Sequence, residues 1–345
     1  MERTLPPLPA SMKDVARAAG VHQATVSRAL RNDPRISEDV RRRVRVAADA
    51  LGYVPNPLLA ALSTLRHQKA SLNSHMTIAY VLRGDSLQQA NNGHIASARN
   101  AAVRRGYKLE KFVIDRELHE ERLNQILITR NIPGIILGPL PDRDRLFALE
   151  WERFCVVAIH NSFREPAFDR VNADNFHMMR VICAQCLRRG FTRVGLVFPL
   201  EVDDRNGGVL RAAYRLAVEN ERKLTALKPL ILPAWDDCAF EKWIREVRPR
   251  VIVSSNTYWS RIEAWLKKAG WRVPRDIGLV NINVIDPEAQ GHAGIHHTST
   301  IGATAARHLI DKINQNERGI PSNRITLLTE GDWHEGNTLA VGDDL

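Results

Sequence analysis

The stretch KDVARAAGVHQATVSRAL, residues 13–30, decides the fold of the N-terminal region. Val15 and Ala19, four residues apart, would form an apolar stripe on one short helix, and Val26 would lie on the inner face of a second. Gly20 stands between them, where the turn of two steeply crossing helices needs a permissive residue. The spacing predicts a helix-turn-helix motif.

A third helix follows, with Ser37 as its N-cap. Its predicted inner face comprises Val40, Val44, Ala48 and Leu51; the last three follow Val40 by 4, 8 and 11 residues, which is helical spacing. Arginines occupy much of the opposite face. The unit has about 40 residues, close to the smallest size that folds without help.

The string DVARAAGV…TVSRAL…RIS…VRRRV…LGY.PN, within Met12–Asn56, resembles the DNA-binding headpiece of the LacI/GalR family of bacterial transcription regulators. The resemblance implies a second helix in the major groove, with Gln23, Ala24 and Arg28 facing base edges. Arginine reads guanine and glutamine reads adenine, whereas alanine contacts only a thymine methyl. His22 departs from the small hydroxyl residue usual at that helix start.

Other matching positions would hold phosphates and set the register without reading sequence. After the headpiece, the family implies a hinge helix over residues 55–75 that wedges a leucine, here Leu62, into the minor groove. Leu62 could instead pack on a neighbouring helix. The candidate DNA-binding residues are Ser11, Lys13, His22, Gln23, Ala24, Thr25, Ser27, Arg28, Arg31, Ser37, Tyr53, Asn56, Ala60 and Leu62.

Charge agrees with a polyanion partner for this region. The net charge is +10, and residues 1–75 hold 12 Lys+Arg against 6 Asp+Glu, more than half of the excess. Four cysteines are too few for a disulfide scaffold, and no apolar run could span a bilayer. Residues 1–10 show no signal peptide and predict a disordered lead-in, so we expect a cytoplasmic protein.

The rest of the chain, residues 76–345, alternates short apolar runs with amphipathic stretches, which predicts an α/β fold with parallel sheets covered by helices. It resembles the same family's effector-binding core, which is similar to periplasmic sugar-binding proteins of type I. The predicted organisation is a helix-turn-helix domain over 11–54, the hinge and linker, and two lobes. Lobe 1 is expected at about 76–169 and 297–325, and lobe 2 at 170–296 and 326–345.

The family resemblance places an effector between the lobes. Arg205 would clamp a hydroxyl or carboxylate, Asn256 would bind hydroxyls, and Trp235 would stack on an apolar ring face. Asn283 and His160 stand where sugar-responsive members often have aspartates, which weakens the usual diol clamp. The candidate effector-binding residues are Arg83, His160, Arg205, Trp235, Asn256 and Asn283.

These features predict a homodimeric regulator, more often a repressor, that binds a palindromic operator and responds to a small molecule, a carbohydrate or derivative. A solute-binding protein or enzyme with an accessory DNA module, and a regulator without effector control, are the alternatives. No nucleophile elbow, Walker loop or dinucleotide fingerprint is present, so no enzyme activity, cofactor or metal is expected. The pair Cys183 and Cys186 fits core cysteines better than a zinc site, and the cluster His292, His296 and His297 fits a surface better than a metal site.

Overall fold

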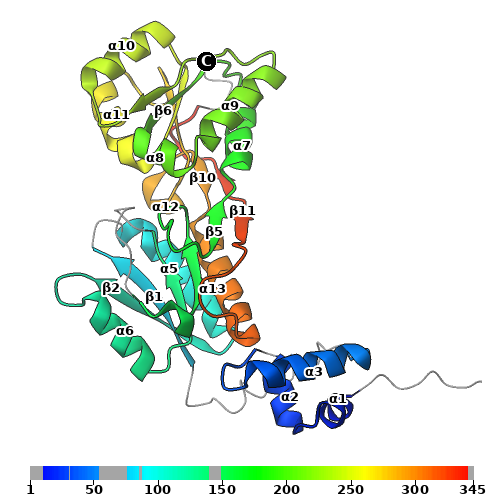
Figure 1. The fold of residues 1–345 in the computed structure, drawn as a ribbon. Helices are drawn as coiled ribbons and strands as arrows, with labels where there is room; N and C mark the ends of the chain where they lie inside the picture. Colours follow the sequence, from blue (N-terminus) through cyan, green and yellow to red (C-terminus); the bar gives the residue numbers. More distant parts are fainter. Residues whose placement is uncertain (1–10, 31, 54–75, 85–87, 140–148, 341–345) are drawn as a thin grey trace, which may run out of the picture.

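The computed structural model describes residues 11–30, 32–53, 76–84, 88–139 and 149–340, and Figure 1 shows a small helical unit and two stacked α/β lobes. The N-terminal unit contains the three predicted helices: α1 (Met12–Ala19), α2 (Gln23–Leu30) and α3 (Glu38–Ala50). Val15, Val26 and Val44 are fully buried at its centre.

The end of the third helix differs from the prediction. Leu51 is 41% exposed, while Ala47 and Ala48 are buried. The reason is that α3 ends at Ala50, and Leu51 therefore leaves the helical stripe. Tyr53 packs against the core instead, with its backbone N–H bonded to the carbonyl of Ala48 at 2.9 Å.

The first lobe is built on a six-stranded sheet in which every neighbouring pair is parallel. Its strands, in spatial order, are β11 (Thr326–Thr329), β5 (Asp169–Ala173), β4 (Cys155–Ile159), β3 (Gly134–Leu137), β1 (Met76–Arg83) and β2 (Tyr107–Ile114). Alternate residues of β1 face opposite cores: Tyr80 points toward helices α5 (Gln88–Val103) and α13 (Thr298–Gln315), and Val81 toward α6 (Glu120–Thr129). Both faces are covered, as a parallel sheet requires.

The second lobe repeats this plan. Its sheet has the order β12 (Asp332–His334), β10 (Gly294–His296), β9 (Gly278–Asn281), β8 (Val251–Ser254), β6 (Val194–Pro199) and β7 (Leu230–Leu232), and only the β10–β12 pair is antiparallel. Helices α7 (Asn175–Arg188) and α9 (Val209–Asn220) cover one face, and α10 (Asp237–Val247) and α11 (Asn256–Lys268) cover the other. The remaining short elements are η1 (Trp151–Arg153), α8 (Leu200–Arg205) and α12 (Pro287–Gln290).

The strand order within each sheet agrees with the predicted α/β class and shows where the lobes divide. The expected lobe boundaries fell at 169/170 and 325/326, but β5 and β11 pair with each other in the first sheet. The crossings into the second lobe therefore follow Ala173 and Thr329, a few residues later. The physical reason is that Asp169–Ala173 forms one continuous buried strand, so the chain stays in the first lobe until this strand ends. The sequence pattern did not show where the strand ends.

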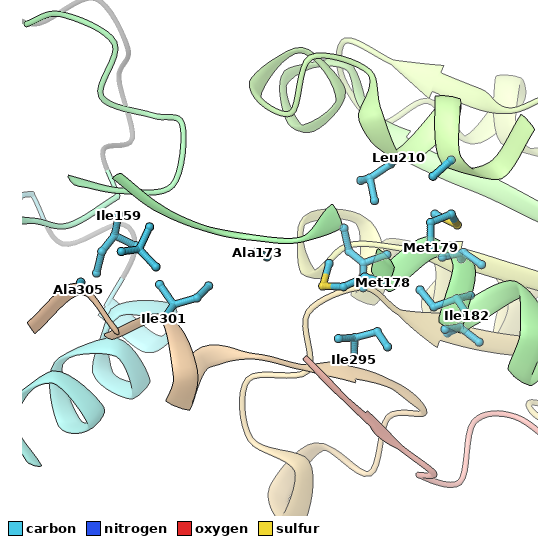
Figure 2. Close-up of a cluster of buried hydrophobic side chains, with 14 of the residues drawn as sticks. Ile159, Ala173, Met178, Met179, Ile182, Leu210, Ile295, Ile301 and Ala305 are labelled. Atoms are coloured by element: carbon cyan, nitrogen blue, oxygen red, sulfur yellow. The ribbon is translucent and has the colours of Figure 1, made fainter. Parts of the chain in front are cut away.

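The crossings are packed into a continuous apolar core. Figure 2 shows Ile159, Ile301 and Ala305 on the side of the first lobe, Met178, Ile182 and Ile295 on the side of the second, and Ala173 between them. Because close-packed interiors transmit small displacements, a shift of one lobe is felt at the junction of the other.

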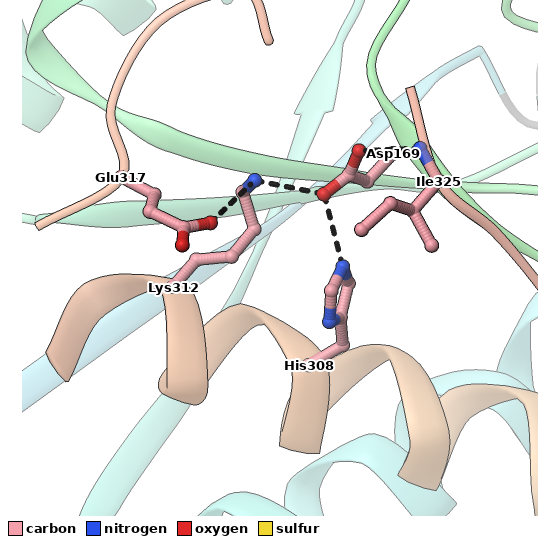
Figure 3. Close-up of polar contacts among 5 residues, drawn as sticks. All are labelled: Asp169, His308, Lys312, Glu317 and Ile325. Carbon is pink, nitrogen blue, oxygen red and sulfur yellow. Dashed lines mark hydrogen bonds and ion pairs between the residues drawn. The ribbon is translucent and has the colours of Figure 1, made fainter. Parts of the chain in front are cut away.

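A buried ion pair fastens α13 to the first sheet (Figure 3). The Asp169 carboxylate accepts hydrogen bonds from Lys312 Nζ at 2.8 Å, His308 Nε2 at 3.0 Å and the Ile325 N–H at 2.9 Å. Burial alone would raise the pKa of the Asp169 carboxyl, but these donors hold the pKa well below its usual range. The network joins β5, α13 and the segment that leads into β11.

Candidate functional site

The exposed face of α2 carries the residues expected to read bases. Gln23, Ala24 and Arg28 are exposed, whereas Val26 and Ala29, on the opposite face, are fully buried. Ser27 is half-buried beside the exposed positions. The helix thus anchors by one side and offers a short polar surface on the other, which is the geometry a major-groove helix needs.

The start of α2 is capped by an unexpected group. His22 Nδ1 accepts a hydrogen bond from the Ala24 N–H at 3.3 Å. An imidazole nitrogen therefore satisfies a backbone donor that a serine or threonine oxygen usually serves. This resolves the departure noted in the sequence at His22.

The residues expected to hold phosphates surround this face. Ser11 is the N-cap of α1: its N–H and its hydroxyl both donate to the Asp14 carboxylate, at 2.9 and 2.6 Å. These bonds place the pKa of Asp14 below its usual value. Lys13 and Ser37 are exposed, and Thr25 and Tyr53 are half-buried. Arg31, Asn56, Ala60 and Leu62 lie outside the described residues.

The second candidate site is the one expected between the lobes, and its location follows from the topology of the two sheets. The chain leaves β5 and the edge strand β11 of the first sheet at their carboxyl ends to cross to the second lobe, and it leaves β10 of the second sheet in the same way to cross back. The carboxyl ends of both sets of strands therefore face the space between the lobes. This is the edge at which open parallel sheets bind ligands.

Three histidines lie close together at the carboxyl ends of the first-lobe strands; His94 and His297 are buried and His160 is half-buried. The ring centroids of His94, on α5, and His160, after β4, lie 5.2 Å apart, and those of His160 and His297, before α13, lie 6.2 Å apart. His160 has a positive φ of 62°, and its Nδ1 lies 3.0 Å from Asn172 Oδ1. Both ring nitrogens of His94, and Nδ1 of His297, have no partner among the described residues.

These imidazoles are held in the neutral form. Burial lowers the pKa of His94 well below its usual value and that of His297 to about 3. Burial also lowers the pKa of His160, opposed by the bond to Asn172 and assisted by the charge of Arg205. A neutral imidazole has one donor and one acceptor nitrogen, so the cluster can exchange hydrogen bonds in both directions.

Three asparagines lie at the corresponding strand ends of the second lobe. Asn256, at the start of α11, donates from Nδ2 to the Asn283 carbonyl at 2.6 Å and accepts from Asn281 Nδ2 at 2.7 Å. The Asn283 Oδ1 is buried and has no partner within the described residues. Behind them, the His292 ring lies 4.1 Å from the Trp259 ring, centroid to centroid.

The two arginines expected at this site are paired with acids. Arg83, at the end of β1, forms an ion pair with Glu120, and Arg205, on α8, forms one with Glu201. The Arg205 Nε atom is buried and has no partner among the described residues. Trp235 packs against Phe240 and Tyr258, with centroids 5.0 and 5.2 Å away, and its indole donates to Asp237 at 2.8 Å.

Comparison with known proteins gives a direct match for the N-terminal unit. The family described as bacterial regulatory proteins, lacI family, matches residues 11–56. The chain carries a LacI-family helix-turn-helix region. The resemblance seen at residues 12–56 of the sequence is thereby confirmed.

Curated relatives of the chain include transcription regulators from Escherichia coli K12. The chain is 32% identical over 189 residues to the HTH-type transcriptional regulator GntR, a match that covers 53% of each chain. It is 31% identical over 134 residues to the HTH-type transcriptional repressor CytR, covering 37% of this chain and 35% of that one. The chain thus spans about half the length, or less, of these relatives, which are regulators and not enzymes, as the sequence predicts.

Solved structures share the fold over nearly the whole chain. A complex of the transcriptional regulator CelR with cellobiose has a TM-score of 0.57 at 19% identity, covering 95% of this chain and 99% of that one. The lac repressor dimer bound to operator and an anti-inducer has a TM-score of 0.55 at 17% identity, covering 96% and 100%. At this level of identity the likeness shows the fold alone, and the predicted two-lobed fold is confirmed.

The strand ends between the lobes also bring together residues that the sequence did not point to. His94 lies in α5, where nothing in the local pattern separates it from an ordinary helix position, and Asn172 and Asn281 lie inside buried strands. His297 was seen only as part of a loop cluster with His292 and His296. In the structure these three diverge: His297 joins His94 and His160, His292 stacks on Trp259, and His296 Nδ1 lies 2.9 Å from the Val284 carbonyl.

The structure also bears on a zinc site at the paired cysteines and on membrane-spanning helices. Cys183 and Cys186 are buried on α7, and burial raises the pKa of the Cys183 thiol to about 12. Within the described ranges, no group of three or more His, Cys, Asp or Glu residues could hold a metal ion. None of the described helices combines the length and the apolar character that crossing a bilayer requires.

Proposed function

We propose that the protein is a homodimeric, cytoplasmic transcription repressor that binds a palindromic operator and is controlled by a small molecule held between its lobes. The observation that carries the DNA-binding part is the exposed face of α2, with Gln23, Ala24 and Arg28 opposite buried Val26 and Ala29. A dimer presents two such helices, and the symmetry of the site then mirrors that of the protein.

Selection of DNA from a random library with the purified full chain tests this part. We expect a recovered palindrome, bound with an affinity that falls steeply as salt rises. A library that yields no preferred sequence, with or without added small molecules, would contradict the proposal.

For the effector, we propose an uncharged polyhydroxy compound of the carbohydrate class. Arg83 and Arg205 are each paired with a glutamate, and the three histidines are neutral. The partnerless buried atoms include acceptors and imidazole nitrogens of either role, on His94, His297 and Asn283. A hydroxyl both donates and accepts, so it satisfies such a set, whereas a carboxylate only accepts.

A thermal-shift screen of the full chain against neutral sugars and their acid counterparts tests the effector class. A neutral sugar that binds should raise the melting temperature with concentration, be recovered unchanged, and change operator affinity. Asn256→Ala should abolish the shift, while Arg222→Ala, an exposed change away from the strand ends between the lobes, should retain it. A response to sugar acids alone would overturn the uncharged class, and consumption of the sugar would indicate an enzyme.

The control of DNA binding would act through the lobe junction. A ligand that bridges His94 or His160 and the amides of Asn256 and Asn283 changes the relative orientation of the lobes. The differential binding energy for the two orientations sets the change in operator affinity. The hinge with Leu62, through which this change would reach the DNA, lies outside the described residues.

A further inference from the structure

A cavity lies on the outer side of the second lobe, away from the strand ends that face the first lobe. It has a volume of about 1060 Å³ and lies between α10 and α11. Its lining extends to Pro249 and Trp271, which precede strands β8 and β9. The cavity therefore reaches the amino ends of these strands, whereas the candidate site between the lobes lies at their carboxyl ends. Figure 1 shows α10 at the end of the second lobe farthest from the first.

The walls of this cavity offer aromatic surface. Trp265 and Trp271 both line it and are half-buried. Trp265 is fixed from behind by Phe240, whose ring meets it edge-on at a centroid distance of 5.1 Å. Rigid indole faces of this kind stack against flat rings at little entropic cost.

Three cations from two separate segments border the same cavity. Arg248 follows α10, Arg250 precedes β8, and Lys268 ends α11; all three are exposed and line the cavity. No carboxylate among the described residues lies within ion-pair distance of any of them. The Arg248 loop is held in place by Arg193, whose Nε donates to the Arg248 carbonyl at 2.8 Å.

The acidic residues of the lining are already engaged. Glu241 pairs with Arg245 at 2.5 Å, Asp276 pairs with Arg272 at 2.9 Å, and Asp237 accepts from the Trp235 indole at 2.8 Å. A helix carboxyl end accounts for one nearby cation such as Lys268. It does not account for Arg250, which belongs to no helix. The indole is neutral, so Asp237 keeps its charge; three cations without an ion-pair partner among the described residues, against this one carboxylate, leave a positive rim beside an aromatic wall.

We propose that this cavity is a second ligand site, which binds an anion that carries a flat ring, as a mononucleotide does. The ring lies against Trp265 and Trp271, and the anionic group is held by Arg250, Lys268 and Arg248. Arginine forks bind phosphate oxygens in pairs, which favours phosphate over a single point charge. Because the site is separate from the candidate site between the lobes, its existence does not depend on the proposed effector.

Cys238 supplies a built-in reporter of occupancy. It lines the cavity and is exposed, whereas the other three cysteines, Cys155, Cys183 and Cys186, are buried. N-ethylmaleimide, which is uncharged, should therefore label Cys238 selectively in the folded full chain. A ligand seated in the cavity shields the thiol.

The experiment measures the labelling rate with adenosine 5′-monophosphate as the probe. At about ten times its dissociation constant we expect labelling to slow roughly tenfold, because only the unoccupied fraction reacts. Adenosine and inorganic phosphate, each alone at the same concentration, should have little effect. Arg250→Gln with Lys268→Gln should abolish the protection, as should Trp271→Leu. The matched control, Arg261→Gln with Lys267→Gln, changes two exposed cations of α11 that do not line the cavity and should retain it.

Several results would overturn the proposal. One is an unchanged labelling rate in the presence of the nucleotide. Another is equal protection in the Arg250/Lys268 variant and in its control. Protection by phosphate alone would remove the role of the ring, and protection by adenosine alone would remove the role of the cations.

Discussion

Gln23, Ala24 and Arg28 come from one turn and a half of a single helix, whereas His94, His160 and His297 come from three segments spread over most of the body. The residues of the first group are exposed to solvent. In the second group His94 and His297 are buried and His160 is half-buried, burial lowers the pKa of all three, and ring nitrogens of His94 and His297 have no partner among the described residues. The comparison teaches that the exposed face of one helix can be encoded by a short stretch of sequence, while a cluster of buried polar side chains requires the whole fold.

The largest expected effect concerns the stability of the first lobe, which positions the histidine cluster. Replacing Lys312 by methionine leaves the buried Asp169 carboxylate with the His308 imidazole and the Ile325 N–H as its remaining hydrogen-bond partners, and should lower the free energy of unfolding by about 3 kcal/mol. Urea unfolding followed by tryptophan fluorescence measures the body alone, because all seven tryptophans lie at position 151 or beyond. Lys267→Met, an exposed change, should stay within about 0.5 kcal/mol of the parent. Equal losses in the two variants would mean that the buried ion pair is not what fastens α13.

The next effect would sharpen the division of labour within the headpiece. Arg28→Ala should cost about 1–3 kcal/mol on the selected operator and relax base preference at one position. Lys13→Ala should weaken binding to all sequences alike and reduce the salt slope by about 1. Competition binding on single-base variants of the operator, at several salt concentrations, separates these outcomes. A uniform loss in both variants would contradict the assignment of α2 as the reading helix.

The pH dependence would test the neutral state of the histidine cluster. The folded-state pKa values of His94, His160 and His297 are lowered, so the unfolded chain binds protons first as pH falls through about 6.5. The stability that these groups contribute is complete above that pH and declines below it, by up to about 1.4 kcal/mol per pH unit for each. Urea unfolding between pH 5 and 7 should show this slope, and His94→Gln should make it shallower. A slope that the variant leaves unchanged would show that His94 is not buried in its neutral form.

The smallest effect concerns the cap of the reading helix. His22→Ala removes the acceptor of the Ala24 N–H and should cost about 1 kcal/mol, which weakens operator binding roughly fivefold. His22→Ser supplies another acceptor and should restore most of the affinity. If the alanine variant changed base preference instead of affinity, His22 would be a reading residue and not a cap.

The sequence went furthest where the relevant contacts are close in the chain. The stripe of Val15 and Val26 and the turn at Gly20 depend on neighbours within a few residues, so periodicity and turn chemistry predict them. The alternation of strands and helices likewise predicted the α/β body. The limits appear at ends, where Leu51 leaves its helix and β5 extends to Ala173, because a boundary depends on what packs there as much as on local propensity.

The candidate site between the lobes was only partly predictable for a related reason. Strand ends and the family resemblance led us to name Asn256, Asn283, His160 and Arg205, and their role in binding a ligand stays a prediction. His94 could not be named in this way, because its environment is created by α13 and by the segment after β4, far away in the chain. Trp235, expected to stack on a ligand, is occupied by Phe240 and Tyr258 in the described structure.

What the sequence by itself determined is the short-range chemistry: three helices around a valine core, an exposed reading face, and strand–helix repeats that must form parallel sheets. What the tertiary structure decided is which distant polar groups share a space and in what charge state. His94 and His297 are buried and held in the neutral form because α5, the segment after β4 and the segment before α13 come together in the first lobe. Arg83 likewise meets Glu120 because α6 packs against the sheet that contains β1. Burial and electrostatics act across space, so no local pattern can contain them.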